Sequence, residues 1–242
     1  LNESTNIENW VGYLLLIASV ITPSPIFLNY GPLAGNKYFL LITGFIILYF
    51  GRNIKLKFSH ISILFLFFIF QIFGILYWME LKLFIFQIYF IFAFIVASIL
   101  NINYFDFFIK ISSKFILILL IGATIGFFYT IAGGTEFFSI LNEDARSNGF
   151  YFSTFSNSYV RGVIRPAGIY DEPGAFSFVI CIIAALRKIR GFSEKGTWII
   201  LILGFLTFSI AHVIYTIFHF FQDLKKWKFK NLFILVFLFI LI

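Results

Sequence analysis

The chain has 242 residues, of which 61% are hydrophobic and 22% aromatic, while only 12% are charged. A water-soluble fold of this length cannot bury so much apolar surface, so the composition excludes an ordinary soluble domain and indicates a membrane protein. The formal net charge is +7, but the basic residues fall in short clusters between apolar runs, which indicates membrane orientation and not nucleic-acid binding. A single cysteine, Cys181, excludes a disulfide framework and a thiolate metal site.

Apolar runs follow one another along the chain, and roughly 20 residues of helix cross the hydrocarbon core of a membrane. We expect about eight such segments, near residues 10–28, 36–50, 61–79, 82–100, 114–132, 173–186, 197–221 and 231 onward. Pro23 and Pro25 either end the first one early or kink it. The predicted fold class is an all-α, polytopic transmembrane helical bundle, which forms a single integral membrane domain over 1–242. Because the chain stops inside an apolar run, we expect it to be truncated at its C-terminal end.

The positions of Lys and Arg predict the orientation, because cytoplasmic loops carry an excess of both residue types. The loops 51–60 and 187–196 hold such clusters and are expected on the cytoplasmic side. Counting the apolar runs between them places the N-terminus inside and the segment 133–172 outside. The sequence therefore predicts a multi-pass protein with one long exported loop.

The segment 197–221 leaves two alternatives open, because the lysines at 225, 226, 228 and 230 follow it. A single crossing would place these lysines outside, whereas a shallow hairpin that turns near Ser209 would keep them inside. A straight helix over this segment would be about 39 Å long, which is enough for one tilted crossing. The charge rule favours the hairpin.

The exported loop carries Arg146, Arg161 and Arg165 and no lysine. Arginine presents a fixed fork of donors that matches phosphate and carboxylate groups, whereas lysine acts as a point charge. We interpret these arginines as an anion site for a lipid phosphate or pyrophosphate. The alternative is that they pair with Asp171, Glu172 or phospholipid headgroups and only fix the loop.

The sequence Asp-Glu-Pro-Gly at 171–174 predicts the start of a helix. Proline is favoured at the first helical position and aspartate just before it, so Asp171 is expected to cap the helix. Glu172 has two alternative roles. It either helps to start the helix, or acts as a general base that takes a proton from a hydroxyl group.

His212 and His219 fall on roughly one helical face. No cluster of Asp, Glu or Cys accompanies them in the sequence to complete a metal site, so we expect neither a metal nor another cofactor. If the chain turns near Ser209, His212 lies close to that turn and faces the same site as the arginines.

A polytopic chain whose exported loop ends in Arg-x-x-Gly-x-x-x-Glu-Pro-Gly resembles the Wzy-type polymerases of O-antigen and capsular polysaccharide repeat units. The matching residues here are Arg165, Gly168, Glu172, Pro173 and Gly174. The segment LTFSIAHVIY, 206–215, is similar to the Thr-x-Ser motif of these polymerases and of the related O-antigen ligases. Ile210 and Ala211 follow the serine, where many relatives have an arginine or a small polar pair.

The resemblance implies an enzyme, a glycosyltransferase-type polysaccharide polymerase of the cell envelope, integral to the bacterial cytoplasmic (inner) membrane. It would transfer a growing glycan from undecaprenyl pyrophosphate to another lipid-linked repeat unit on the outer face, without a nucleotide sugar. The implied catalytic residues are Glu172, Arg165 and Arg161. The implied substrate-binding residues are Arg146, Gly168, Tyr170, Asp171, Ser209 and His212.

The resemblance also implies partners, namely undecaprenyl-pyrophosphate-linked glycans, membrane lipids, a flippase and a chain-length regulator, and no nucleic acid. Three alternatives remain open. An O-antigen ligase shares the donor chemistry but uses another acceptor. A transporter or flippase of lipid-linked sugars would bind pyrophosphate with the same arginines without a reaction. The third alternative is a fragment with no activity of its own.

Overall fold

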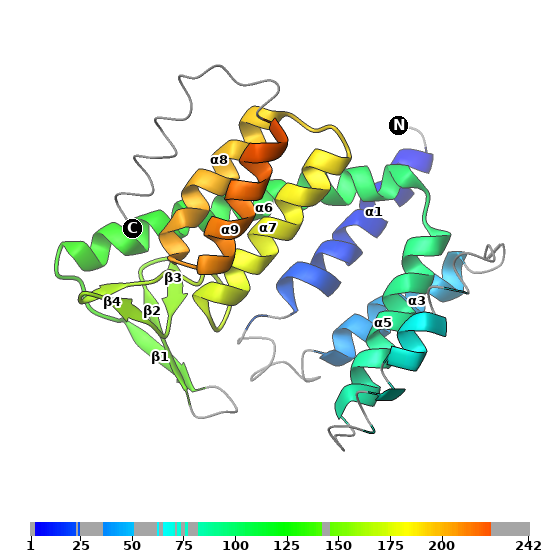
Figure 1. Cartoon of the computed structure of the whole chain (residues 1–242), viewed down its shortest axis with the longest axis horizontal. Helices are drawn as coiled ribbons and strands as arrows, with labels where there is room; N and C mark the ends of the chain where they lie inside the picture. Colours follow the sequence, from blue (N-terminus) through cyan, green and yellow to red (C-terminus); the bar gives the residue numbers. More distant parts are fainter. Residues whose placement is uncertain are drawn as a thin grey trace. The chain divides into compact units, whose positions relative to one another are not determined.

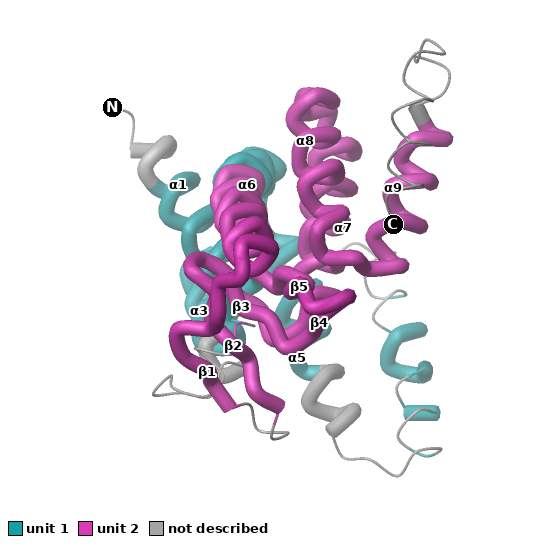
Figure 2. Tube along the Cα trace, turned by 90° about the vertical axis from the view of Figure 1, so that its left-hand side faces the viewer, with its two compact units in different colours: residues 1–23, 27–111 teal, residues 24–26, 112–242 magenta. Residues whose placement is uncertain are grey.

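The structure is a computed structural model, which describes residues 3–22, 24, 36–50, 62, 65–70, 72–73, 76, 82–141 and 146–223. The chain divides into two compact units, which Figure 2 distinguishes by colour. Unit 1 comprises residues 1–23 and 27–111, and unit 2 comprises residues 24–26 and 112–242.

Unit 1 is helical in its described residues. It contains α1 (Glu3–Leu16), the π-helix η1 (Ile17–Ile21), α3 (Asn36–Phe50), α5 (Lys82–Ile99) and the first part of α6 (Ile102–Ile131). Its buried core is formed by Val11, Ile46, Val96 and Leu100. Helix α1 continues into η1, which ends just before Pro23 because a proline ring clashes with the preceding turn. Of the two alternatives for the first apolar run, the described residues show a helix end before Pro23.

Unit 2 contains two antiparallel sheets that the sequence did not predict (Figure 1). One sheet has the order β1-β2-β3 and the other pairs β4 with β5. The strands are β1 (Phe138–Leu141), β2 (Ser147–Tyr151), β3 (Thr154–Ser156), β4 (Tyr159–Val160) and β5 (Val163–Ile164). They account for 16 of the 40 residues of the segment 133–172, so the segment contains a paired β-structure and is not an irregular loop throughout.

The three-stranded sheet packs directly on the backbone of α6. Ser153 Oγ donates to the carbonyl oxygen of Gly122 at 2.7 Å, and a Cβ added at Gly126 would lie 2.4 Å from Thr154 Cγ2. Glycines four residues apart share a helix face, so the missing side chains let the sheet approach this closely. The β2–β3 turn and the start of β3 thus contact α6 around Gly122 and Gly126.

Another face of α6 exposes large apolar side chains at a spacing of three or four residues. These are Ile118, Ile121, Ile125, Phe128 and Ile131, each at least 45% exposed. No charged residue interrupts the sequence between Lys114 and Glu136. This stripe is an exposed apolar surface of α6 within unit 2.

The remaining helices of unit 2 are α7 (Pro173–Ile189), α8 (Glu194–Gly204) and α9 (Ile210–Asp223), with the 3-10 turn η3 (Phe205–Thr207) between the last two. Helix α7 contacts both α8 and α9 (Figure 1). His212 Nε2 lies 2.8 Å from the Leu201 carbonyl oxygen, and the Trp198 and His219 ring centroids are 5.1 Å apart. Helices α8 and α9 therefore run antiparallel, and the favoured turn near Ser209 is confirmed. The lysines at 225–230 lie outside the described residues.

The expected all-α polytopic bundle with about eight membrane spans is wrong. The described residues include five strands in two sheets. Among the helices that the structure describes, only α6, with a mean hydropathy of 2.1, is long and apolar enough to cross a membrane. One such helix also occurs in the cores of soluble proteins, so it does not show a membrane protein by itself.

The error has a physical reason. Apolar composition located the helices correctly at 36–50 and 82–100, but it did not reveal where helices stop. The run 197–221 is broken at Thr207 to Ser209, and the apolar helices Ile7–Ile21, Phe39–Phe50, Ile88–Ile99 and Ile210–Gln222 are all shorter than a span. The expected segment from 231 onward lies outside the described residues.

Candidate functional site

Glu172 lies at the start of α7, where the two-stranded sheet and its following loop lead into the helix. It is the N-cap residue, with extended backbone angles and no side-chain cap hydrogen bond, and Pro173 occupies the first helical position as predicted. The N-cap residue is therefore Glu172, and the expectation from the sequence that Asp171 caps the helix is wrong. The Glu172 carboxylate is left available for another contact.

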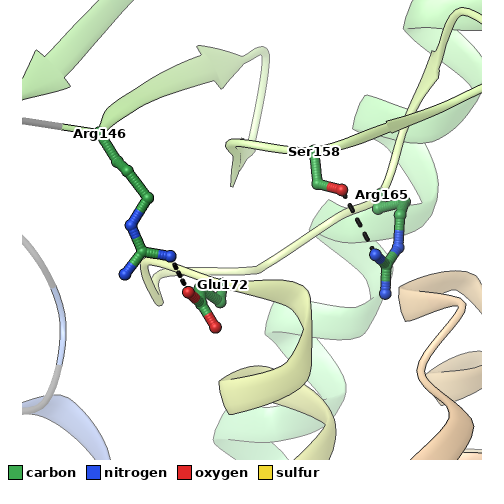
Figure 3. Close-up of polar contacts among 4 residues, drawn as sticks. All are labelled: Arg146, Ser158, Arg165 and Glu172. Carbon is green, nitrogen blue, oxygen red and sulfur yellow. Dashed lines mark hydrogen bonds and ion pairs between the residues drawn. The ribbon is translucent and has the colours of Figure 1, made fainter.

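That contact is an ion pair between Glu172 Oε1 and Arg146 Nη1, which Figure 3 shows. Arg146 directly precedes β2, the central strand, so the pair joins the start of that strand to the start of α7. The two side chains are 43% and 49% exposed. Exposed ion pairs contribute only about 0–1 kcal/mol, so a bound substrate can separate this pair at little cost.

Arg165 has a different environment, inside unit 2 (Figure 3). Its Nε donates to the Thr207 carbonyl oxygen at 3.2 Å, Nη2 donates to the Phe208 carbonyl oxygen at 2.9 Å, and Nη1 donates to Ser158 Oγ at 3.3 Å. These bonds join the loop before α7 to the turn between α8 and α9. The two segments that carry the family resemblance, around Arg165 and around Thr207, are therefore in direct contact.

This contact changes the role of Arg165. Phe208 has a φ of 48°, so the turn is held in a left-handed conformation that a phenylalanine rarely adopts. Arginine has five N–H donors, and three of them face this turn and Ser158. The interpretation of Arg165 as a free phosphate-binding fork is not supported, because its donors hold the turn.

Gly168 joins the loop before α7 to β3 through two hydrogen bonds. Its N–H donates to Thr154 Oγ1 at 2.9 Å, and its carbonyl oxygen accepts from the Phe155 N–H at 2.8 Å. The φ of Gly168 is +64°, and an added Cβ would lie 3.2 Å from the Phe176 ring. The motif glycine therefore allows the backbone to pack closely and does not present a binding surface.

We expect Gly168→Ala to lower the free energy of unfolding by about 1–3 kcal/mol, because alanine is strained at positive φ and crowds the Phe176 ring. Chemical unfolding of the detergent-solubilised protein would measure this change. Gly174→Ala is the matched control, since no atom lies within 4 Å of its added Cβ and the residue is helical. An unchanged stability in Gly168→Ala would contradict the packing role.

Tyr170 is also a structural residue. It is 1% exposed, and its ring stacks on that of Phe176 with a centroid distance of 5.7 Å. Burial raises the pKa of the Tyr170 phenol well above its ordinary value of 10.0. A direct contact with a bulky substrate is excluded by this burial unless the loop moves.

The raised pKa of Tyr170 predicts a loss of stability at high pH. Above about pH 10 the unfolded chain loses the phenolic proton while the folded chain keeps it, so the free energy of unfolding falls as pH rises. We expect Tyr170→Phe to make this fall shallower, as measured by denaturant unfolding between about pH 8 and about pH 11. Tyr13→Phe, at a tyrosine that is 48% exposed, is the control. An equally steep fall in Tyr170→Phe would count against the burial argument.

Arg161 and Asp171 are not part of these contacts. Arg161 lies at the tip of the β4–β5 hairpin, where it and Gly162 have φ values of 52° and 84°. Its side chain is exposed, and it has no hydrogen bond or ion pair with any residue that the structure describes. Arg161 and Arg165 therefore do not act as a pair, and Arg161 presents an exposed guanidinium group at the hairpin tip.

Ser209 and His212 are buried, at 7% and 0% exposure. The His212 ring lies between Leu201 and Cys181, with Nε2 2.8 Å from the Leu201 carbonyl oxygen and Nδ1 3.6 Å from Cys181 Sγ. Since a carbonyl oxygen only accepts, Nε2 carries the proton and His212 ties α9 to α8. The expectation that His212 faces the arginines is wrong.

Several residues that build the site were not singled out in the sequence. Ser158 and Thr154 support Arg165 and Gly168 from the sheets, and Tyr151 contacts both Tyr159 and Glu136 through its hydroxyl group. The separations range from 7 to 15 residues. No local pattern marks such contacts, because they depend on strand pairings that were not predicted.

The described residues contain no group of three or more His, Cys, Asp or Glu side chains that would hold a metal ion. A scan against protein-family models finds no match to this chain. Searches of curated proteins and of solved structures find no match either.

Proposed function

We propose that the protein is a membrane-bound glycosyltransferase that lengthens glycans carried on a lipid pyrophosphate, as in the assembly of O-antigen or capsule repeat units. The observation that carries this proposal is the environment of Glu172. Its carboxylate is half exposed and makes no cap bond, and within the described part of the chain it is held by an ion pair that a substrate can displace. A carboxylate of this kind is suited to accept a proton from an attacking sugar hydroxyl.

The three arginines have different roles in this proposal, namely phosphate binding and positioning. Arg146 already pairs with a carboxylate and is half exposed, so it can exchange that partner for a phosphate oxygen. Arg161 is exposed at the hairpin tip and can meet a second phosphate. Arg165 is a positioning residue, because it fixes the turn at Thr207 and Phe208 beside the loop that leads to Glu172.

The reaction needs no external energy source in this scheme. The base removes the proton from the acceptor hydroxyl, the oxygen attacks the anomeric carbon, and the bond to the pyrophosphate oxygen breaks. The arginines stabilise the charge that develops on the leaving pyrophosphate. The exposed stripe on α6 is the surface that we propose contacts the lipid, which would keep the site next to a lipid-linked substrate.

The test compares the glycan made by cells from which the gene is deleted with the glycan made by the same cells after the gene is restored. If the proposal is right, the deletion leaves single repeat units on the outer face, and the restored gene returns long polymer. Polymer that forms but is not attached to its final acceptor in the deletion strain would indicate a ligase. Repeat units that accumulate on the inner face would indicate a transporter, and both results would contradict the proposal.

A further inference from the structure

A second polar site lies at the other end of α7, in the loop that joins it to α8. A pocket of about 560 Å³ opens there, and its wall includes Lys188, Ser193, Glu194, Lys195 and His219. Helix α7 has 17 residues, which corresponds to about 25 Å of helix. The pocket is therefore separate from Glu172, which begins the same helix.

Arg187 lies behind this wall and is only 8% exposed. Its Nε donates to Thr197 Oγ1 at 3.0 Å, Nη2 donates to the Ser193 carbonyl oxygen at 3.1 Å, and the guanidinium carbon is 5.5 Å from the Phe192 ring centroid. These partners are all neutral. Among the residues that the structure describes, no carboxylate pairs with this buried guanidinium group, so its positive charge acts close to the pocket.

The charges around the pocket are predominantly positive. Lys188 and Lys195 on the wall and Arg187 behind it supply three positive charges, against the one negative charge of Glu194. The amino-terminal end of α8 forms part of the same wall, and its dipole acts in the same direction as the lysines. Ser193 and Thr197 add hydroxyl groups beside these charges.

We propose that this pocket binds a phosphate group. Lysines suit a phosphate because they act as point charges. The pocket is large enough for a phosphodiester or pyrophosphate together with part of the organic group that the phosphate is bonded to. The phosphate comes either from a free anion or from the headgroup of an anionic lipid. The site is independent of the reaction proposed at Glu172.

The test compares the full-length protein with two double variants. Lys188→Ala with Lys195→Ala removes the lysines of the pocket, and Lys110→Ala with Lys114→Ala removes the same number of charges from exposed positions on α6. Calorimetry with inorganic pyrophosphate measures the free anion. Co-sedimentation with phosphatidylglycerol vesicles, against phosphatidylcholine vesicles, measures the lipid headgroup.

We expect the pocket variant to bind about tenfold or more weakly than the α6 variant, because each charge-assisted contact strengthens binding severalfold. Glu194→Gln is expected to bind more tightly than the unmodified protein, since it removes the opposing charge from the wall. If the pocket variant binds pyrophosphate more weakly than the α6 variant, the ligand is the free anion. If the two variants differ only in binding to the vesicles, the ligand is the lipid headgroup. Equal binding by both double variants with both probes, or weaker binding by Glu194→Gln, would overturn the proposal.

Discussion

Replacing Glu172 with glutamine is expected to lower glycan elongation by roughly 10²- to 10⁴-fold, the range that a general base contributes. The amide keeps the size and much of the hydrogen bonding of the side chain but cannot accept the proton of the attacking hydroxyl. The surface glycan should then consist of single repeat units, which gel electrophoresis of the extracted glycan separates from polymer.

Asp171→Asn is the matched control, because it makes the same chemical change at the neighbouring residue, which is not the N-cap residue of α7. It should leave the polymer length nearly unchanged. The stability of Glu172→Gln should also change by less than about 1 kcal/mol, since only an exposed ion pair is lost. Polymer of normal length in cells with Glu172→Gln would show that Glu172 is not the general base.

Replacing Arg165 with lysine is expected to lower the free energy of unfolding by about 2–4 kcal/mol. A hydrogen bond to a charged group contributes about 1.5–3 kcal/mol, and a single ammonium group cannot reach Thr207, Phe208 and Ser158 together. Denaturant unfolding of the detergent-solubilised protein measures the change.

The same substitution at Arg161 supplies the control for Arg165. Arg161 lies exposed at a hairpin tip, so Arg161→Lys should change stability by less than about 0.5 kcal/mol. It should instead weaken substrate binding if Arg161 meets a phosphate. Equal stability losses in the two variants would mean that the contacts of Arg165 with the turn contribute nothing specific.

Two helix boundaries beside prolines were predictable from the sequence, whereas the starts of α1 and α6 lie at Glu3 and Ile102 and not near 10 and 114 as expected. Proline at the first helical position marked the beginning of α7 at residue 173, and Pro23 marked the end of the first helical run, because each acts through the local backbone. The turn near Ser209 was favoured only through the lysines that follow it. A charge rule therefore located a break that composition alone did not reveal.

The sheets were missed because their strands are short and one turn has an unusual residue. The β2–β3 turn places Phe152 at a φ of 57°, where a glycine or asparagine would have marked a hairpin. Arg161-Gly162, between β4 and β5, did carry a recognisable turn signal. It went unused because a chain interpreted as a bundle of membrane helices leaves no place for strands.

Of the predicted site residues, Arg146 pairs with Glu172 and Arg165 bonds the turn at Thr207 and Phe208, whereas Arg161 and His212 lie apart from these contacts. Spacing and residue type identified Arg146, Arg165, Gly168 and Glu172, and all of them contribute to the start of α7 or the loop before it. Their side-chain hydrogen-bond partners lie 7 to 43 residues away in the sequence. The residue type shows which groups an arginine side chain can bind. Whether backbone carbonyl oxygens already accept its hydrogen bonds, as they do at Arg165, depends on the fold.

The most direct test of the central claim is elongation by the purified protein in lipid vesicles that contain a lipid-pyrophosphate-linked repeat unit and no nucleotide sugar. The account predicts a ladder of products that grow by one repeat unit at a time, with equal release of lipid pyrophosphate, and loss of both in Glu172→Gln. Repeat units that cross the bilayer without growing in length would contradict it.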